Sequence, residues 1–192
     1  MPLLLTRRRT FDSHRTRGIP QQSIPLMQLA VDSLAVYAAM CKYFVVIAPN
    51  AVHENTNECN LASYARRGWC RLEQWARMTA GFTGMYLATD SGFQPFEMMN
   101  VNSAMRVFEG DFTVSSDKNK LLCTTLGLWA RIVQSTETDP SSDLMDMREH
   151  IMMHQQEIFP PDIFGDLPNR VIKVRARRLS NARLPLSGLE LT

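Results

Sequence analysis

Residues 41–78 constrain the fold of this chain more than any other stretch. Within them, residues 43–47 form a run of aromatic and β-branched side chains that ends at Pro49, a pattern typical of a short buried strand. A polar segment follows, and residues 64–79 then carry apolar side chains at helical spacing. A strand, a polar crossover and a helix form the unit from which parallel sheets are built, so we predict an α/β fold.

The composition is ordinary for a globular protein. Of 192 residues, 45% are hydrophobic and 21% are charged, which fits a single chain whose core is large enough to fold alone. The net charge of +2 is too small to imply a nucleic-acid partner, and no apolar run approaches the ~20 residues that span a membrane. We therefore expect neither nucleic-acid nor membrane binding, and a cytoplasmic location.

The cysteine pattern favours a reducing compartment. Cys41, Cys59, Cys70 and Cys123 form no C-x-x-C pair and match no zinc-site spacing, so we expect free thiols. Residues 1–18 are rich in arginine and show no helix or strand period, which predicts a disordered basic segment. Because this segment is poor in acidic residues, a transit peptide is an open alternative.

Periodicity and turn residues predict the remaining elements. Helices are expected at residues 23–40, 117–134 and 144–158, and short strands at residues 85–87, 105–108 and 171–174. Loops are expected at residues 89–95 and 135–142. The helix at 23–40 is apolar almost all round, so we expect other elements to cover it on most sides.

The predicted helix at 64–79 carries the one residue for which chemistry is indicated, Glu73. Ligands of doubly wound sheets bind beyond the carboxyl ends of the strands, and this helix can carry Glu73 back to that crevice. Beside Trp69 or Trp75, burial would raise the pKa of the carboxyl, which could then act as a general base or stabilise a developing cation in glycosidic bond cleavage. The alternative is an exposed pair between Glu73 and Arg77, worth about 0.3–0.5 kcal/mol.

The segment FVVIAPNAV … YARRGWCRLEQW resembles the middle of a TIR (Toll/interleukin-1 receptor) domain. Trp69, Cys70 and Glu73 match the W-C-x-x-E box of that family, and Pro49-Asn50 matches the S-P-N motif that ends its strand. The segments IPQQS, RGWCRLE and EGDFT resemble TIR-like proteins of protists more closely. The resemblance covers residues 19–80 well and continues more loosely to about residue 134.

The resemblance implies a flavodoxin-like, TIR-type three-layer parallel sheet at residues 19–134. A helical and edge-strand extension at 135–178 and a disordered tail at 179–192 would complete the chain. In TIR domains a strand, a helix and a second strand precede the helix predicted here at 23–40. Because residues 1–22 show no such pattern, we expect the domain to be incomplete at its N-terminus, with an open sheet edge.

Two functions follow from the resemblance. In enzymatic TIR domains the matching glutamate drives cleavage of NAD at the nicotinamide–ribose bond, which implies that Glu73 is catalytic. Trp69, Cys70, Pro49 and Asn50 would then bind the nucleotide; NAD would be a substrate, and no cofactor is expected. Other members are signalling modules that associate with further copies or with other TIR-like domains. Without the first strand, we expect self-association ahead of catalysis, and an inactive remnant is a third alternative.

Three further patterns carry alternatives. His53, Glu58 and Cys59 lie in a segment that is either a solvated insertion or a metal site. His150 and His154 are one helical turn apart, but no third ligand is obvious, so we expect no metal there. The basic stretch at 170–178 is either a solvated face or a phosphate-binding patch, and the scarcity of aromatic residues favours the solvated face.

Overall fold

The computed structural model describes residues 23–52, 58–81, 83–95, 101–142 and 144–182. Its strands are β1 (Phe44–Ile47), β2 (Ala51–Val52), β3 (Glu58–Cys59), β4 (Met85–Thr89) and β5 (Gly92–Pro95). Its helices are α1 (Ile24–Asp32), α2 (Leu34–Met40), α3 (Leu61–Arg66), α4 (Gly68–Met78), α5 (Val101–Met105), the 3-10 helix η1 (Val107–Glu109), α6 (Asp117–Lys120), α7 (Leu122–Thr138), α8 (Met145–Met153), α9 (Gln155–Ile158), α10 (Pro161–Phe164) and α11 (Leu167–Ala182).

The sheet confirms the α/β prediction. β1 and β4 are parallel, with Phe44 opposite Met85 and Ile47 opposite Ala88, and the chain passes from one to the other through α3 and α4. This is a βαβ unit, which is how parallel neighbours must be joined. β5 then pairs antiparallel with β4, so the sheet order is β1-β4-β5. The predicted strands at 43–47 and 85–87 therefore both exist.

The loop predicted at residues 89–95 is wrong, because β4 and β5 form a hairpin there. Thr89 pairs with Gly92 across a turn made by Asp90 and Ser91, and the Thr89 hydroxyl accepts a hydrogen bond of 3.2 Å from the Ser91 N–H. Gly92 has a φ of +121°, which glycine adopts without strain. The strand is short and has turn-forming residues on both sides, so the sequence pattern favoured a loop.

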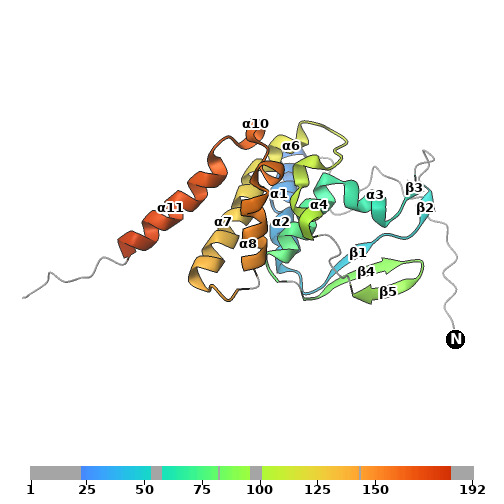
Figure 1. Ribbon diagram of the computed structural model, residues 1–192. Helices are drawn as coiled ribbons and strands as arrows, with labels where there is room; N and C mark the ends of the chain where they lie inside the picture. The colour runs from blue at the N-terminus through green and yellow to red at the C-terminus, as the bar shows by residue number, and fades with distance from the viewer. Residues whose placement is uncertain (1–22, 53–57, 82, 96–100, 143, 183–192) are drawn as a thin grey trace, which may run out of the picture.

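Helices cover one face of the sheet. Val46, Ala48 and Leu87 are buried there, and Leu61 and Tyr64 of α3 pack against them. Figure 1 shows α3 and α4 running along this side of the sheet. Among the described elements no helix packs on the opposite face, so the described part of the chain leaves that face uncovered.

A larger core joins α4 to the C-terminal helices. Trp75 of α4 and Trp129 of α7 both contact the ring of Phe159, at centroid distances of 6.1 and 6.3 Å. The Trp129 indole N–H also donates to the Pro168 carbonyl at 3.1 Å, which ties α11 to α7. The predicted amphipathic helix at 117–134 is confirmed as α6 and α7, whose inward residues Trp129, Ile132 and Val133 are almost fully buried.

The predicted cover around the helix at 23–40 is wrong. The helix breaks at Ser33, whose hydroxyl donates to the Leu29 carbonyl at 2.7 Å. Ala35 and Ala38 of α2 pack into the core, whereas the larger apolar side chains stay exposed, among them Leu26, Leu29, Val36, Tyr37 and Met40. Small residues let α2 approach α4 closely and leave its bulky side chains outside.

Two predicted strands are helical. Residues 105–108 span the end of α5 and the start of η1, and residues 171–174 lie inside α11. Short apolar runs fit either period, and tertiary packing decides: Met105, Val107 and Phe108 enter the core, and Val171 and Ile172 pack against it. α7 extends to Thr138 into the predicted linker, the helix at 144–158 breaks at His154, and α11 extends to Ala182 into the predicted tail. No described helix is long and apolar enough to cross a membrane.

Candidate functional site

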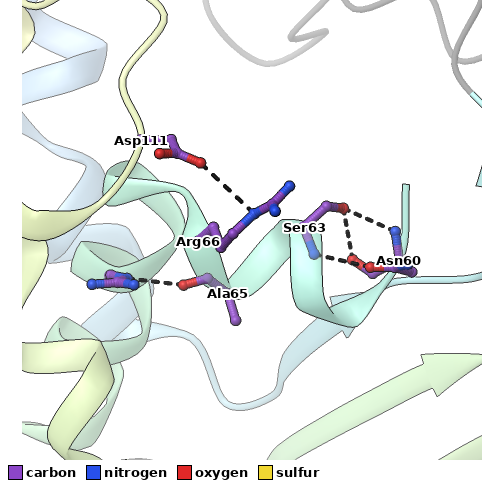
Figure 2. Close-up of polar contacts among 6 residues, drawn as sticks. Asn60, Ser63, Ala65, Arg66 and Asp111 are labelled. Carbon is purple, nitrogen blue, oxygen red and sulfur yellow. Dashed lines mark hydrogen bonds and ion pairs between the residues drawn. The ribbon is translucent and has the colours of Figure 1, made fainter. Parts of the chain in front are cut away.

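The joint between α3 and α4 positions Glu73. A capping box starts α3: the Asn60 side chain accepts from the Ser63 N–H and the Ser63 hydroxyl accepts from the Asn60 N–H, both at 2.9 Å (Figure 2). The helix ends at Arg66, and Arg67 takes an extended conformation with φ −76° and ψ 128°. The single helix predicted at 64–79 is therefore two helices with a sharp turn between them.

Two glycines and a short bridge fix this turn. The Gly68 N–H donates to the Asp111 carbonyl at 3.0 Å, and the Asp111 N–H donates to the Arg66 carbonyl at 2.8 Å. A Cβ on Gly110 would lie 2.6 Å from the Gly68 backbone, and one on Gly68 would lie 2.0 Å from the ring of Phe112. Only glycine at both positions allows so close an approach.

Arg71 closes the joint from α4. Its Nε donates to the Ala65 carbonyl at 2.9 Å and its Nη1 donates to the Arg106 carbonyl at 2.8 Å, and Figure 2 shows the Ala65 acceptor beside Arg66. Carbonyls near a helix end lack intrahelical partners, so a guanidinium is well suited to satisfy them. The Arg66–Asp111 ion pair in the same figure is exposed and 3.8 Å long, and such pairs contribute little.

Beyond this turn, Tyr64, Arg67, Cys70 and Glu73 form the group that we call the Glu73 cluster. Burial raises the pKa of the half-buried Glu73 carboxyl, and the Arg67 guanidinium partly offsets the rise. Burial also raises the pKa of Tyr64, with further contributions from Cys70 and Glu73, and it raises the pKa of Cys70 to about 12. The phenol and the thiol therefore stay protonated near neutral pH, beside a carboxyl that ionises reluctantly.

The predicted burial of Glu73 is confirmed, but its surroundings differ from those expected. Trp75 is fully buried in the main core, and Trp69 meets Phe112 edge-on at 6.4 Å while packing against the same core. The charge that shifts the pKa of Glu73 is instead that of Arg67, which lowers it. The charge of Glu73 in turn raises the pKa of Tyr64 and of Cys70.

The alternative of an exposed pair between Glu73 and Arg77 is wrong. Arg77 is only 6% exposed, and its Nη2 donates to the Thr83 carbonyl. The guanidinium thus holds the segment that leads into β4. The cation that acts on Glu73 is Arg67, from the turn between the helices.

The structure brings some of the predicted site residues together and separates others. Cys70 lies in the Glu73 cluster, whereas Trp69 packs against the main core. Pro49 and Asn50 are exposed at the carboxyl end of β1, where the Asn50 N–H donates to Asp90 Oδ2 at 2.7 Å. Tyr64 connects the sheet to the Glu73 cluster. It packs against the buried group of Val46, Ala48 and Leu87, and the charge of Glu73 raises the pKa of its phenol.

Tyr64 and Arg67 were missed at the level of the sequence. A signal was present, because Tyr64, Arg67, Cys70 and Glu73 recur at intervals of three residues. On an unbroken helix, Tyr64 and Glu73 would be about 2.5 turns apart and would therefore lie on opposite sides of the helix. Because the helix breaks at Arg67, the two residues belong to different helices and can lie on the same side.

The predicted absence of a metal at the histidine pair stays a prediction. The ring centroids of His150 and His154 are 4.4 Å apart, with the ring planes tilted by 32°. His154 Nδ1 lies 3.3 Å from a carboxylate oxygen of Glu157, which also pairs with Arg106. Within the described ranges, no three His, Cys, Asp or Glu side chains are placed to hold a metal ion. The alternative metal site of His53, Glu58 and Cys59 stays a prediction, because His53 lies outside the described ranges.

The second candidate site is the uncovered face of the sheet. Residues directly opposite in the register share a face, so Val45 and Tyr86 form one row and Ile47, Ala88 and Phe93 form the next. Tyr43 extends this surface, since its ring lies 5.9 Å from that of Tyr86, and Tyr86 stacks on Phe93 at 4.8 Å. We call Tyr43, Val45, Ile47, Tyr86, Ala88 and Phe93 the open sheet face.

The open sheet face is strongly exposed and uncharged. Phe93 is 63% exposed and Ile47 is 72% exposed, although both belong to strands. A contiguous apolar patch on a sheet usually marks a contact with another molecule or element. All four cysteines have free thiols, as predicted, so no disulfide links these elements.

A polar cavity of about 420 Å³ lies elsewhere, at the carboxyl ends of α4 and α7. Thr79, Arg131, Ser135, Asp139 and Ser142 contribute to its lining.

Comparisons with protein-family models, with curated proteins and with solved structures found no match.

Proposed function

We propose that this chain is a signalling-type interaction module that associates with further copies of itself through the open sheet face. The observation that carries the proposal is the exposure of Ile47 and Phe93 on a sheet whose other face is packed. Parallel strands are normally covered on both faces, so we expect the uncovered face of this sheet to contact another molecule. Centres of protein interfaces are rich in aromatic side chains and poor in charge, as this face is.

The finer fold belongs to the same proposal. We infer a flavodoxin-like, TIR-type arrangement of the sheet and its helices. The parallel pair β1–β4 with its helical crossover supports this inference, as does the position of β1 at one edge of the sheet formed by the described strands. In TIR domains, which part of this chain resembles, further strands continue the sheet on that side and helices cover both faces.

Sedimentation of the full chain over a concentration series tests self-association. We expect the average mass to rise with concentration for the wild type. Ile47→Glu should weaken association by about tenfold or more, because it buries a charge in an apolar contact. Met153→Glu is the matched control, since Met153 on α8 is 73% exposed and Ile47 is 72% exposed. A wild type that stays monomeric at high concentration contradicts the proposal.

A second candidate function is cleavage of a glycosidic bond such as the nicotinamide–ribose bond of NAD. The raised pKa of Glu73 favours it, because a desolvated carboxyl is a competent general base and interacts strongly with a developing cation. Tyr64 and Cys70 are protonated donors in the same cluster, and Arg67 is a cation suited to a phosphate. NAD is the substrate in this proposal, and no cofactor is required.

Release of nicotinamide from NAD tests the second candidate. The wild type should release it, and Glu73→Gln should lose the activity by roughly two orders of magnitude or more, as expected for a general base. Glu149→Gln on the exposed surface of α8 serves as the matched control and should behave as wild type. Equal release from wild type and Glu73→Gln would remove Glu73 from the chemistry.

A further inference from the structure

We infer that two copies pack open sheet face to open sheet face with their strands antiparallel, so that Lys42 of each copy lies against Asp90 of the other. The inference rests on the self-association proposed above and specifies its partner and its orientation. It follows from the charges that flank the uncharged face.

The amino end of the open sheet face is basic. Lys42 is exposed two residues before β1 begins, and its Nζ lies 5.3 Å from the centroid of the Tyr43 ring. Because Tyr43 belongs to the open sheet face, this contact places the ammonium on that side of the sheet. The cation therefore borders the apolar surface where β1 begins.

The carboxyl end of the same face is acidic. Asp90 is exposed directly after β4, and its Oδ2 accepts the 2.7 Å hydrogen bond from the Asn50 N–H. Glu58 of β3 is exposed beyond the same end, since β3 pairs with β2, which follows β1. The parallel pair β1–β4 thus runs from a positive end to a negative end, with no charged residue of the open sheet face between them.

These charges select one of the two ways in which a two-fold axis can stack such faces. A parallel stack would place Lys42 against Lys42 and Asp90 against Asp90, which is repulsive. An antiparallel stack places each lysine against an aspartate, and the symmetry repeats the contact twice. Aligned sheets pack about 10 Å apart, a distance that the exposed Tyr43, Ile47 and Phe93 side chains can fill.

Pairing of two β1 edges is the competing arrangement. It would also bring Lys42 towards Asp90, but it would leave Phe93 on β5, two strands away, as exposed as it is in a single copy. Pro49 lacks an N–H and would end the edge ladder just after β1. Stacking of the faces removes the apolar surface from water, which edge pairing does not do.

Charge reversal tests the arrangement in the full chain. Lys42→Glu and Asp90→Lys should each weaken association about tenfold at low salt, because both contacts of the dimer become repulsive. An equimolar mixture of the two variants should restore it, since in the mixed dimer both contacts are attractive again. Rescue by mixing also shows that both variants fold, and Phe93→Glu should weaken association whatever the charges.

Each outcome bears on the inference. Rescue by mixing together with weakening by Phe93→Glu supports face-to-face packing. Rescue without any effect of Phe93→Glu indicates edge pairing and overturns it. Association that neither charge reversal changes overturns the orientation and leaves self-association standing. A wild type that remains monomeric overturns both.

Discussion

Tyr64 and Glu73 lie close enough for the carboxyl charge to raise the pKa of the phenol, although they are nine positions apart in the sequence. The relationship exists because the chain leaves helical geometry at Arg67, which changes its direction between α3 and α4. Tyr64 also packs against the buried side of the sheet, where Val46, Ala48 and Leu87 lie. One bend therefore links the sheet to the Glu73 cluster.

Substitution of Glu73 by glutamine should stabilise the protein, and the gain should depend on pH. Since burial raises the pKa of the folded carboxyl above its ordinary value, wild type and variant should be equally stable near pH 4, where the carboxyl is protonated in both states. As the pH rises through the raised pKa, the wild type must ionise a buried group and loses stability, while the variant does not.

Thermal unfolding of both proteins between pH 4 and pH 8 measures this difference, where ~1 kcal/mol corresponds to ~2–4 °C for a chain of this size. The midpoint of Glu73→Gln should exceed that of the wild type by a few degrees at neutral pH. Glu149→Gln, at an exposed position, should track the wild type throughout. A wild type more stable than Glu73→Gln at neutral pH would show that the carboxylate is well solvated or paired.

Substitution of Gly110 by alanine should destabilise the joint between α3 and α4. The new Cβ would lie 2.6 Å from the Gly68 backbone, which cannot move aside as a side chain would. We expect a loss of ~1–3 kcal/mol in the free energy of unfolding, typical of overpacking.

Gly127→Ala is the control for the same chemical change. A Cβ on Gly127 meets no atom within 4 Å, and the residue is exposed within α7. Alanine is the better helix former, so this variant should gain roughly 0.5–1 kcal/mol. Denaturant unfolding of the two variants should give shifts of opposite sign. Equal shifts would contradict the close approach of Gly68 and Gly110.

The thiol of Cys70 should be inert in the folded protein. It is buried, and burial raises its pKa to about 12, so the reactive thiolate is scarce. Cys123 is exposed on α7 and should react first with a maleimide. Mass mapping of the labelled chain should find Cys123 modified and Cys70 unmodified until denaturant is added, whereas rapid labelling of Cys70 would contradict the packing of the cluster.

Local patterns predicted the scaffold of the molecule. The β-branched run at 43–47 gives a strand, as predicted. The periodic segments at 64–79 and 117–134 are helical, as predicted, although each is divided into two helices. The weaker segments at 105–108 and 171–174 contain too few residues to distinguish a strand from a helix. Contacts with the main core decided those two, and contacts of that range are invisible in a short window.

The candidate sites were predictable to different degrees. The burial of Glu73 followed from its place beside an apolar stripe, but its neighbours depended on the break at Arg67. That break needs Gly68 and Gly110 to touch, and they are far apart along the chain. The open sheet face depended on the register of the β4–β5 hairpin, in a segment whose turn residues predicted a loop.

Hydroxyl-radical footprinting over a concentration series tests the burial of the open sheet face by a second copy most directly. Phe93 and Tyr37 are equally accessible in one copy, at 63% and 66%, but only Phe93 belongs to that face. Oxidation of Phe93 should fall as the concentration rises, while oxidation of Tyr37 stays constant. Constant oxidation of Phe93 from dilute to concentrated protein would contradict the proposed association.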